Sequence, residues 1–453
     1  MSHSILLSQL VTILAATPIH LTPSEQAKPA VGITTDTRTL EPGQMFLALR
    51  GERFDGHDFV EAAFAAGAVA AIVDQQYTSQ NSKHPLLQVK DTLVAYQEIG
   101  AWWRSQLSIP VVAVTGSVGK TTTKELIAAV LGLKGNVLKT QANYNNEIGV
   151  PKTLLEVTPE HDYAVIEMGM RGRGEIARLS QIARPDIAVI TNVGTAHIER
   201  LGSELAIAQA KCELLAEMPP TSVAILNQDN PLLMETAAQV WSGKTVTFGL
   251  EGGDICADLL DNQTLSFQGM TLPLPLPGRH NALNYLAALA VAQTLNLDLS
   301  CLTAGLTVQL PAGRARRYDL PNDIILLDET YNAGLESMTA ALHLLVQTPG
   351  KRHIAVLGTM RELGAYSSEY HRQVGAVVQQ LKLERLLILA SEPEAGALAA
   401  GAAPVPAEIF TTHESVVARL VEIVESGDRL LFKASRAVEL DRVVEAFLRA
   451  LQP

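Results

Sequence analysis

Cysteine is scarce in this sequence, and the few cysteines present are poorly placed for pairing or for metal binding. The chain of 453 residues has three, namely Cys212, Cys256 and Cys301. They are odd in number, widely spaced and form no Cys-x-x-Cys pair, which argues against a disulfide framework and against a zinc knuckle. The sequence fits a reducing compartment, and we expect a cytoplasmic protein.

Long hydrophobic runs are missing as well. Residues 5–16 resemble a signal-peptide core, but no Lys or Arg precedes them and polar residues interrupt them, so an amphipathic first helix is the better interpretation. The Ala-rich segment 62–73, which Asp74 closes, is far shorter than the roughly 20 apolar residues of a spanning helix. We expect no membrane span and no stable membrane association.

The chain also lacks an excess of positive charge. Its 35 Lys and Arg residues stand against 47 Asp and Glu residues, a formal net charge of -12. Bulk composition therefore indicates no surface for nucleic acid or for an anionic membrane. An anionic small-molecule substrate has to be bound by local basic groups.

The length and the 47% hydrophobic content suggest about three domains of roughly 150 residues each. Short apolar runs alternate with helical stretches, which is typical of βαβ units and a parallel sheet. In the middle of the chain the predicted strands are 111–114, 164–166, 187–190 and 223–226. After a break at 311–314, a second series follows at 324–327, 354–357, 386–389 and 430–432.

We therefore predict an α/β protein of three domains. Residues 1–106 form a small N-terminal α/β domain, and 107–313 form a central domain with a doubly wound, mostly parallel sheet and a P-loop. Residues 314–453 form a Rossmann-like α/β domain. The Ala-rich stretch 396–403 is interpreted as a loop or helix edge.

A glycine-rich loop lies between the predicted strand 111–114 and a predicted helix over 121–133. In that position backbone N–H groups and the positive end of the helix face a nucleotide's phosphates, while Lys120 contacts phosphate oxygens and Thr121 reaches Mg²⁺. Val114 stands where a full Walker A motif has its first Gly, so this is a shorter Gly-x-x-Gly-Lys-Thr-Thr loop. We expect the side chain of Lys120 to face solvent. The predicted nucleotide contacts are Thr115, Gly116, Ser117, Val118, Gly119, Lys120, Thr121 and Thr122.

Two further polar residues follow predicted strands at the same edge of the sheet. Glu167 follows 164–166, and His197 comes after 187–190. Ligands bind at the carboxyl ends of parallel strands, where a carboxylate can hold Mg²⁺ beside the phosphate loop. Taken alone, Glu167 fits a helix cap or a salt bridge equally well, and an isolated His is more often structural.

In their order these features resemble the Mur ligases, a three-domain family of ADP-forming peptide ligases, over nearly the whole chain. The resemblance is carried by 143–149 with Pro151, by 167–176, by 191–197 and by 277–281 with Asn284. These segments are most similar to the member that adds D-alanyl-D-alanine to UDP-N-acetylmuramoyl-tripeptide (UDP-MurNAc-tripeptide). The resemblance implies an ATP-dependent amide ligase of peptidoglycan precursor synthesis that forms an acyl phosphate. It also implies ATP and Mg²⁺ as cofactors, UDP-MurNAc-tripeptide and D-alanyl-D-alanine as small-molecule partners, and a monomer.

The resemblance further implies roles for single residues. The implied catalytic residues are Lys120, Lys211 and His197. The implied metal ligands are Thr121, Glu167, His197 and, if it is carbamylated, Lys211. Adenine, ribose and phosphates would be held by Asn281, Asn284, Arg314 and Asp328. Substrate contacts would come from Thr37, Arg38, Asn143, Asn146, Tyr331 and Asn332.

Several of these implications have alternatives. Lys211 could instead be an ordinary lysine on the solvated surface, with no role in the site. The segments 35–38 and 51–57 resemble the family's UDP-sugar-binding loops, although Asp-Gly turns are common. The sequence departs from the family pattern at Val118, at Gly334-Leu335 and at Thr359.

Other activities also remain open. A folylpolyglutamate synthase and the ligase that adds the third peptide residue share the fold, but the segment 143–149 and the absence of an Asp-Asn-Pro-Arg motif favour the dipeptide-adding ligase. A nucleotide-dependent switch without chemistry is an alternative of a different class. The third residue of the tripeptide, L-lysine or meso-diaminopimelate, stays open.

Overall fold

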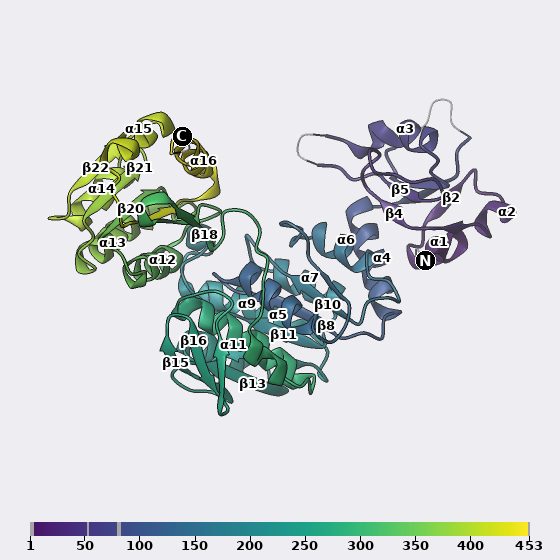
Figure 1. Ribbon diagram of the computed structural model, residues 1–453. Helices are drawn as coiled ribbons and strands as arrows, with labels where there is room; N and C mark the ends of the chain where they lie inside the picture. Colours follow the sequence, from purple (N-terminus) through teal and green to yellow (C-terminus); the bar gives the residue numbers. More distant parts are fainter. Residues whose placement is uncertain (1–3, 52–53, 79–82, 452–453) are drawn as a thin grey trace.

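The computed structural model describes residues 4–51, 54–78 and 83–451. Figure 1 shows three lobes along the chain, coloured purple, teal and yellow-green from the N-terminus to the C-terminus. Each lobe contains a sheet in which most neighbouring strands are parallel. The predicted α/β class with three domains is confirmed. Among the described residues, no helix is both long enough and apolar enough to cross a membrane.

The N-terminal lobe is built on a five-stranded sheet. Its strand order is β2 (Thr17–Ile19), β7 (Leu86–Val89), β6 (Ala70–Asp74), β5 (Met45–Leu47) and β4 (Ile33–Thr34). Only the β2–β7 pair is antiparallel. The predicted first helix is present as α1 (Leu7–Ile13), which buries Leu7 and Leu10. The remaining elements are β1 (Ile5–Leu6), α2 (Pro23–Gln26), β3 (Pro29–Ala30), η1 (Gly56–Phe59), α3 (Val60–Ala65) and α4 (Thr92–Ser105).

The central lobe contains a seven-stranded, wholly parallel sheet. Its order is β14 (Ile255–Cys256), β13 (Lys244–Gly249), β12 (Val223–Asn227), β11 (Ile187–Ile190), β8 (Val111–Thr115), β10 (Tyr163–Glu167) and β9 (Val137–Lys139). The chain runs from β8 to one side of the sheet and later returns to the other side at β11. The strand order therefore reverses beside β8, and ligands bind in the crevice at such a point.

Helices cover both faces of this sheet. One apolar cluster contains residues of α5 (Lys120–Leu131) and α11 (Arg279–Thr294), and another contains residues of α6 (Gly149–Leu155), α7 (Glu175–Ala183) and α9 (Glu204–Glu217). The lobe is completed by α8 (Ile198–Leu201), α10 (Pro231–Val240), η2 (Ser300–Ala304), β15 (Asp258–Asp261), β16 (Thr264–Phe267) and β17 (Met270–Pro273). The antiparallel sheet β15-β16-β17 was not predicted. It buries Leu265, Phe267 and Leu272 in the α5–α11 cluster.

The C-terminal lobe has a six-stranded sheet. Its order is β18 (Arg316–Leu320), β19 (Ile324–Glu329), β23 (Asp428–Lys433), β20 (Arg352–Gly358), β21 (Arg385–Leu389) and β22 (Ala407–Phe410). Only the edge strand β18 is antiparallel to its neighbour. The helices are α12 (Leu335–Gln347), α13 (Ser367–Gln380), α14 (Glu394–Ala402), α15 (His413–Ile423) and α16 (Asp441–Ala450), with short 3-10 turns η3 (Pro321–Asp323), η4 (Gly364–Tyr366) and η5 (Arg436–Val438).

One predicted element of this lobe is wrong. The Ala-rich stretch 396–403, interpreted as a loop or helix edge, lies almost entirely within α14. Alanine is the strongest helix former, and two glycines let α14 approach α13 closely. A Cβ on Gly375 would stand 2.2 Å from the Leu398 carbonyl oxygen, and one on Gly401 would stand 2.1 Å from that of Arg372.

Candidate functional site

The glycine-rich loop joins β8 to α5, as predicted, and the segment after β11 holds its backbone. The Asn192 side chain bonds both backbone groups of Val118: its Oδ1 accepts from the N–H and its Nδ2 donates to the carbonyl oxygen, each at 3.0 Å. Thr191 Oγ1 donates to the same carbonyl oxygen at 2.6 Å. Since these bonds use only the backbone of Val118, the unusual side chain at this position leaves them intact.

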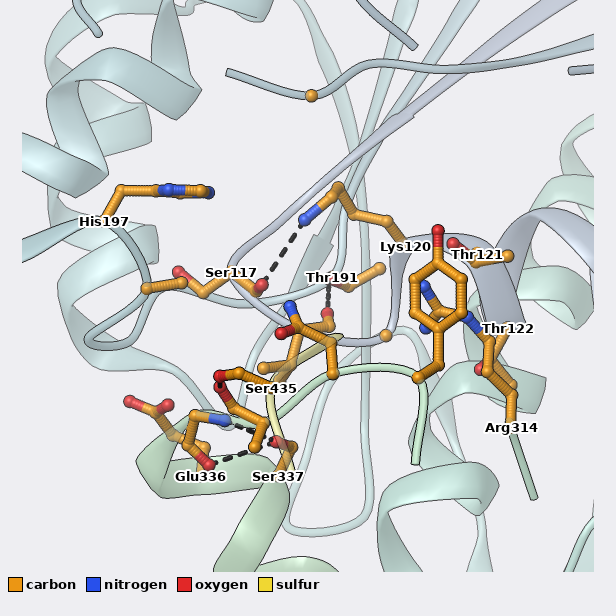
Figure 2. A pocket seen from close by; sticks show the side chains of 18 of the residues that line it. Ser117, Lys120, Thr121, Thr122, Thr191, His197, Arg314, Glu336, Ser337 and Ser435 are labelled. Atoms are coloured by element: carbon orange, nitrogen blue, oxygen red, sulfur yellow. Dashed lines mark hydrogen bonds between the residues drawn. The ribbon is translucent and has the colours of Figure 1, made fainter. Parts of the chain in front are cut away.

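Lys120 begins α5, and its ammonium group lies back over the loop. Its Nζ donates to the carbonyl oxygens of Gly116 at 2.8 Å and Ser117 at 3.3 Å, and Figure 2 shows the Lys120–Ser117 contact. Desolvation by the surrounding protein lowers the pKa of Lys120. The expectation that the Lys120 side chain faces solvent needs correction. Its ammonium group donates to the carbonyl oxygens of the same loop that is expected to bind phosphate.

A cavity of about 690 Å³ opens beside the loop, between the central and C-terminal lobes. Figure 2 shows His197 reaching toward the loop from one side, with Arg314 on another side and Glu336 and Ser337 on the helix opposite. Of the predicted site residues, the cavity is lined by Ser117, Val118, Gly119, Lys120, Thr121, Thr122, Asn143, Asn146, Glu167, His197, Asn281, Asn284, Arg314, Tyr331 and Asn332. Residues from all the segments that the sequence singled out in these two lobes are thus brought to one space.

Glu167 is the last residue of β10, and its side chain is buried at the cavity wall. Oε1 accepts from Asn145 Nδ2 at 2.8 Å, whereas Oε2 is buried and has no hydrogen-bond partner in the part of the chain that the structure describes. Lys124 Nζ, itself buried, lies 3.9 Å from Oε2. Sequence reasoning missed Asn145 and Lys124, although Asn145 stands inside a segment that it singled out.

An orphaned carboxylate oxygen fits a cation, and the site suits Mg²⁺ in particular. Mg²⁺ takes one or two carboxylates, keeps several waters and uses substrate phosphates as further ligands. Thr121, one residue after Lys120, adds a hydroxyl to the same cavity. Among the described residues no three His, Cys, Asp or Glu side chains form a metal-binding group, so phosphate and water would have to supply most of the ligands.

His197 precedes α8 in the left-handed backbone region, at φ 69°. Its Nδ1 donates to the carboxylate of Glu362, which comes from the C-terminal lobe. Nε2 is the other ring nitrogen and makes no hydrogen bond to any described residue, and the ring points into the cavity (Figure 2). Glu362 was not predicted as a site residue.

Lys211 lies in the middle of α9, and only 1% of it is exposed. The alternative of a solvated surface lysine is therefore wrong. Burial, aided by the nearby charge of Lys120, places the pKa of Lys211 well below its usual value. Lys211 does not line the cavity directly.

The opposite end of the cavity carries the two predicted asparagines on one face of α11, with Asn284 Nδ2 donating to Asn281 Oδ1 at 3.4 Å. Arg314 lies over the ring of Tyr331 at 3.9 Å, a cation–π contact, and its Nε is buried with no hydrogen-bond partner among the described residues. Asp328, by contrast, does not line the cavity. Its Oδ1 accepts from the backbone and hydroxyl of Thr330 at 3.1 and 2.6 Å, and burial raises its pKa.

Four other predicted residues also lie outside the cavity. Thr115 is buried and donates to the Met168 carbonyl oxygen at 2.8 Å, and Gly116 abuts Thr191. Thr37 and Arg38 belong to the N-terminal lobe, where the guanidinium of Arg38 binds Asp36 at 2.6 Å.

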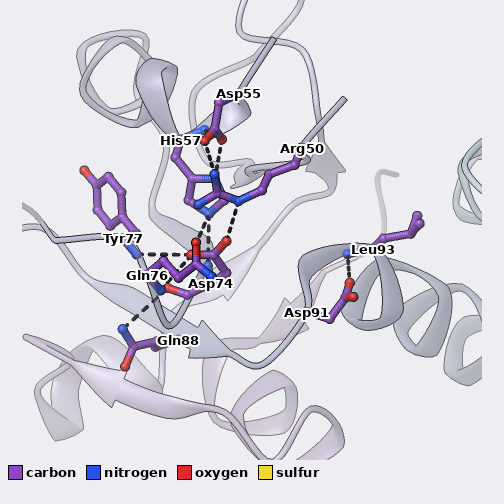
Figure 3. Close-up of polar contacts among 9 residues, drawn as sticks. All are labelled: Arg50, Asp55, His57, Asp74, Gln76, Tyr77, Gln88, Asp91 and Leu93. Carbon is purple, nitrogen blue, oxygen red and sulfur yellow. Dashed lines mark hydrogen bonds and ion pairs between the residues drawn. The ribbon is translucent and has the colours of Figure 1, made fainter. Parts of the chain in front are cut away.

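The N-terminal segment that resembles a UDP-sugar loop is fixed by a polar network (Figure 3). His57 Nδ1 bonds Asp55 Oδ1 at 2.6 Å, while His57 Nε2 accepts from the backbone N–H of Asp74 at 3.0 Å. Arg50 donates to Asp74 at 2.7 Å and also pairs with Asp55. Residues 52 and 53 of the predicted loop 51–57 lie outside the described residues. The network fastens both ends of the loop to β6.

Comparison with known proteins gives one consistent result. Residues 30–103 match the family model described as "Mur ligase family, catalytic domain", residues 114–292 the "Mur ligase middle domain", and residues 313–436 the "Mur ligase, glutamate ligase domain". Curated relatives carry the name UDP-N-acetylmuramoyl-tripeptide--D-alanyl-D-alanine ligase, and two of them serve as examples. The one from Synechocystis is 60% identical over 92% of this chain and 91% of its own. The one from Escherichia coli is 39% identical over 91% and 93%.

Solved structures agree with these sequence relatives. MurF from Acinetobacter baumannii superposes with a TM-score of 0.89 at 32% identity, over 99% of both chains. MurF ligase from Thermotoga maritima, in complex with ADP, superposes with a TM-score of 0.82 at 31% identity, over 93% of this chain and 97% of that one.

Proposed function

This chain belongs to the Mur ligase family, and we propose that it joins D-alanyl-D-alanine to UDP-MurNAc-tripeptide while ATP is converted to ADP and phosphate. It is an ATP-dependent peptide ligase of peptidoglycan precursor synthesis. The observation that carries this function is the cavity of about 690 Å³ between two lobes, which combines a glycine-rich phosphate loop with an orphaned carboxylate and a buried lysine nearby.

The chemistry explains why a nucleotide site is needed. A carboxylate resists attack by an amine, because its charge repels nucleophiles and it has no good leaving group. Transfer of the γ-phosphoryl group of ATP to the terminal carboxylate of the tripeptide removes both obstacles and gives an acyl phosphate and ADP. The amine of D-alanyl-D-alanine then attacks the acyl carbon, loses a proton and expels phosphate, so one amide bond forms for each ATP consumed.

Residues of the loop supply most of the phosphate binding in this proposal. Backbone N–H groups at the start of α5 face the phosphates, and the ammonium of Lys120 moves from the loop carbonyls to the transferring group, where positioned charge stabilises the transition state. Arg314, Asn281 and Asn284 hold the rest of the nucleotide. Asp328 binds Thr330 and does not line the cavity, so we assign Asp328 a supporting role next to the nucleotide site.

Thr121, Glu167 and His197 would hold Mg²⁺, with Lys211 contributing once it is carbamylated. The metal, when bound, offsets the negative charge of the β- and γ-phosphates. A buried amine with a lowered pKa is neutral over more of the pH range, which is the form that reacts with carbon dioxide. Burial of Lys211 therefore supports carbamylation.

Substrate binding completes the proposal. We assign Thr37 and Arg38 to the UDP-sugar, Asn143 and Asn146 to the peptide near the reacting carboxylate, and Tyr331 and Asn332 to the incoming dipeptide. The division at 106/107 and 313/314, the cytoplasmic location and the monomeric state belong to the same proposal. In it, Arg38 has to exchange its bond with Asp36 for the diphosphate.

The activity is tested with purified protein, ATP and Mg²⁺, given D-alanyl-D-alanine and UDP-tripeptides ending in L-lysine or meso-diaminopimelate. We expect phosphate release only when tripeptide and dipeptide are both present, together with a product mass equal to their sum minus water. Phosphate release that does not require both the tripeptide and the dipeptide would favour a nucleotide switch. Product with glutamate in place of the dipeptide would favour a folylpolyglutamate synthase, whose solved example shares the fold at 17% identity.

A further inference from the structure

The C-terminal lobe contacts one segment of the central lobe beside the phosphate site. This segment, residues 194–201, contains the end of the loop after β11 and the short helix α8. Two carboxylates of the C-terminal lobe, those of Glu336 and Glu362, bind to it. Neither was predicted from the sequence, and neither has a role in the mechanism given above.

Glu336 lies in the first turn of α12 and binds the beginning of the segment. Its Oε1 accepts from the backbone N–H of Thr195 at 2.6 Å, and its Oε2 accepts from the Thr195 hydroxyl at 3.2 Å. A Cβ on Gly194 would stand 2.3 Å from Oε1. The carboxylate therefore fits against a backbone that only glycine leaves open at this position.

Glu362 follows β20 and binds the segment at two points. Its carboxylate accepts from His197 Nδ1, and its backbone carbonyl oxygen accepts from the N–H of Glu199 at 3.2 Å. Gly364 packs on Glu199, since a Cβ there would lie 3.0 Å from the glutamate side chain. Ile198 and Leu363 are buried in one continuous apolar cluster that includes residues of both lobes.

Two residues at this contact have a backbone conformation that is rare for residues other than glycine. His197 has φ 69° and Glu362 has φ 62°. Non-glycine residues are rare in this left-handed region and persist there where their surroundings fix them. Here each of the two strained residues binds the other.

We propose that Glu362 is a positioning residue which, together with Glu336, latches the C-terminal lobe onto residues 194–201 and thereby turns Nε2 of His197 toward the phosphate site. A histidine that serves a metal or phosphate site commonly donates its other ring N–H to a carboxylate, which fixes its tautomer and orientation. Here that carboxylate is supplied by a different lobe. Docking of the C-terminal lobe and completion of the His197 side of the site are therefore one event. The role of His197 rests on the proposed function, whereas the latch itself does not.

Replacement of Glu362 by Gln keeps an acceptor oxygen but removes the charge, and replacement by Ala removes both. The ordered series wild type, Glu362→Gln, Glu362→Ala thus separates positioning from general loss of packing.

Glu384 offers a matched control within the same lobe. It also pairs with a histidine, His353, through the backbone N–H at 2.6 Å and the ring at 4.0 Å. Its side chain is 42% exposed, against 40% for Glu362. The Glu384 contact joins β20 to the segment before β21 and involves no other lobe.

The first readout is lobe docking in the absence of substrates and metal. It is measured as the distance between one spin label on α10 and another on α15. We expect Glu362→Ala and the double variant Glu336→Gln/Glu362→Ala to shift the distribution to longer distances, Glu362→Gln to shift it less, and Glu384→Ala to leave it unchanged. If Glu362→Ala does not fold, Glu362→Gln and Glu336→Gln alone carry the test. Distances equal to wild type in every folded variant overturn the latch.

The second readout is the split between kcat and KM for ATP at saturating Mg²⁺, together with ADP affinity by calorimetry. Loss of a partner that orients a site histidine typically costs about 10- to 100-fold, so we expect a drop of that size in kcat/KM for Glu362→Ala, partial recovery with Gln, and no change for Glu384→Ala. Equal kinetics for the Glu362 and Glu384 variants overturn the positioning role. If the wild type makes no amide product while Glu362→Ala still undocks the lobes, the proposed function fails and the latch stands.

Discussion

Gly119 gives the sharpest prediction about the phosphate loop. It precedes α5 with φ 81°, in the left-handed region, and an added Cβ would stand 2.5 Å from Oδ1 of Asn284. That oxygen cannot move freely, because it accepts from the Thr123 hydroxyl at 3.1 Å. Gly119→Ala therefore has to distort either the loop or the contact between α5 and α11.

The size of the effect follows from these two contributions. The left-handed conformation disfavours Ala by roughly 1–2 kcal/mol, and loss of the Thr123–Asn284 hydrogen bond adds about 1 kcal/mol. If the empty loop relaxes and has to be restored on binding, a total of about 2–3 kcal/mol appears as weaker nucleotide affinity. At about 1.4 kcal/mol per factor of ten, this is roughly a 30- to 140-fold increase in the dissociation constant of ADP.

Gly174 provides a close control. It also precedes a helix, α7, at φ 82°, but a Cβ there meets nothing within 4 Å. We expect Gly174→Ala to lower the free energy of unfolding by about 1 kcal/mol and to leave ADP binding unchanged. Calorimetric titration of both variants with ADP and Mg²⁺ decides the matter. Binding to Gly119→Ala within about threefold of wild type would refute the reasoning.

Three further predictions test other parts of the account. Lys120→Ala should lower kcat at least about 100-fold, the scale for losing one donor that stabilises transition-state charge, while circular dichroism stays native; turnover near wild type rejects its role. Because burial lowers the pKa of Lys211, its neutral amine should carbamylate above that pKa, so removing carbon dioxide should lower turnover and bicarbonate should restore it; turnover that ignores bicarbonate contradicts this. Arg352 forms a two-point bond, at 2.8 and 2.7 Å, with Asp428, which is fully buried. Arg352→Ala should therefore cost about 3–5 kcal/mol in urea unfolding, whereas Arg442→Ala, at an exposed pair, should cost under about 1 kcal/mol.

The sequence predicted best where local pattern and chain order act together. Each predicted strand of the central and C-terminal lobes is present, because β-branched apolar runs buried on both faces have few alternatives to a parallel strand. The phosphate loop was predicted for a similar reason. When a strand, a glycine-rich turn and a helix follow one another, the backbone N–H groups at the start of the helix point toward a bound phosphate. Segment 396–403 was wrongly interpreted as a loop or helix edge, because the close packing of α14 on α13 joins segments that are separate in the sequence.

The residues that sequence reasoning missed depend on contacts between distant segments. Asn145 binds Glu167 across 22 positions, and Glu362 binds His197 across 165. No periodicity within either segment encodes the other. The burial of Lys211 is of the same kind: the side chain lies in a helix whose local pattern gives no sign of which face is covered. Only the packing of the lobes supplies that information.

The central claim, that a triphosphate bound at Gly119 and Lys120 activates the carboxyl end of the tripeptide, has one direct test. The terminal carboxylate of the tripeptide is labelled with heavy oxygen, the complete reaction is run, and the phosphate released is analysed by mass. An acyl phosphate intermediate requires one labelled oxygen in each phosphate, because the carboxylate oxygen that attacks phosphorus leaves with it. Phosphate that carries only unlabelled oxygen while amide product accumulates would contradict the account.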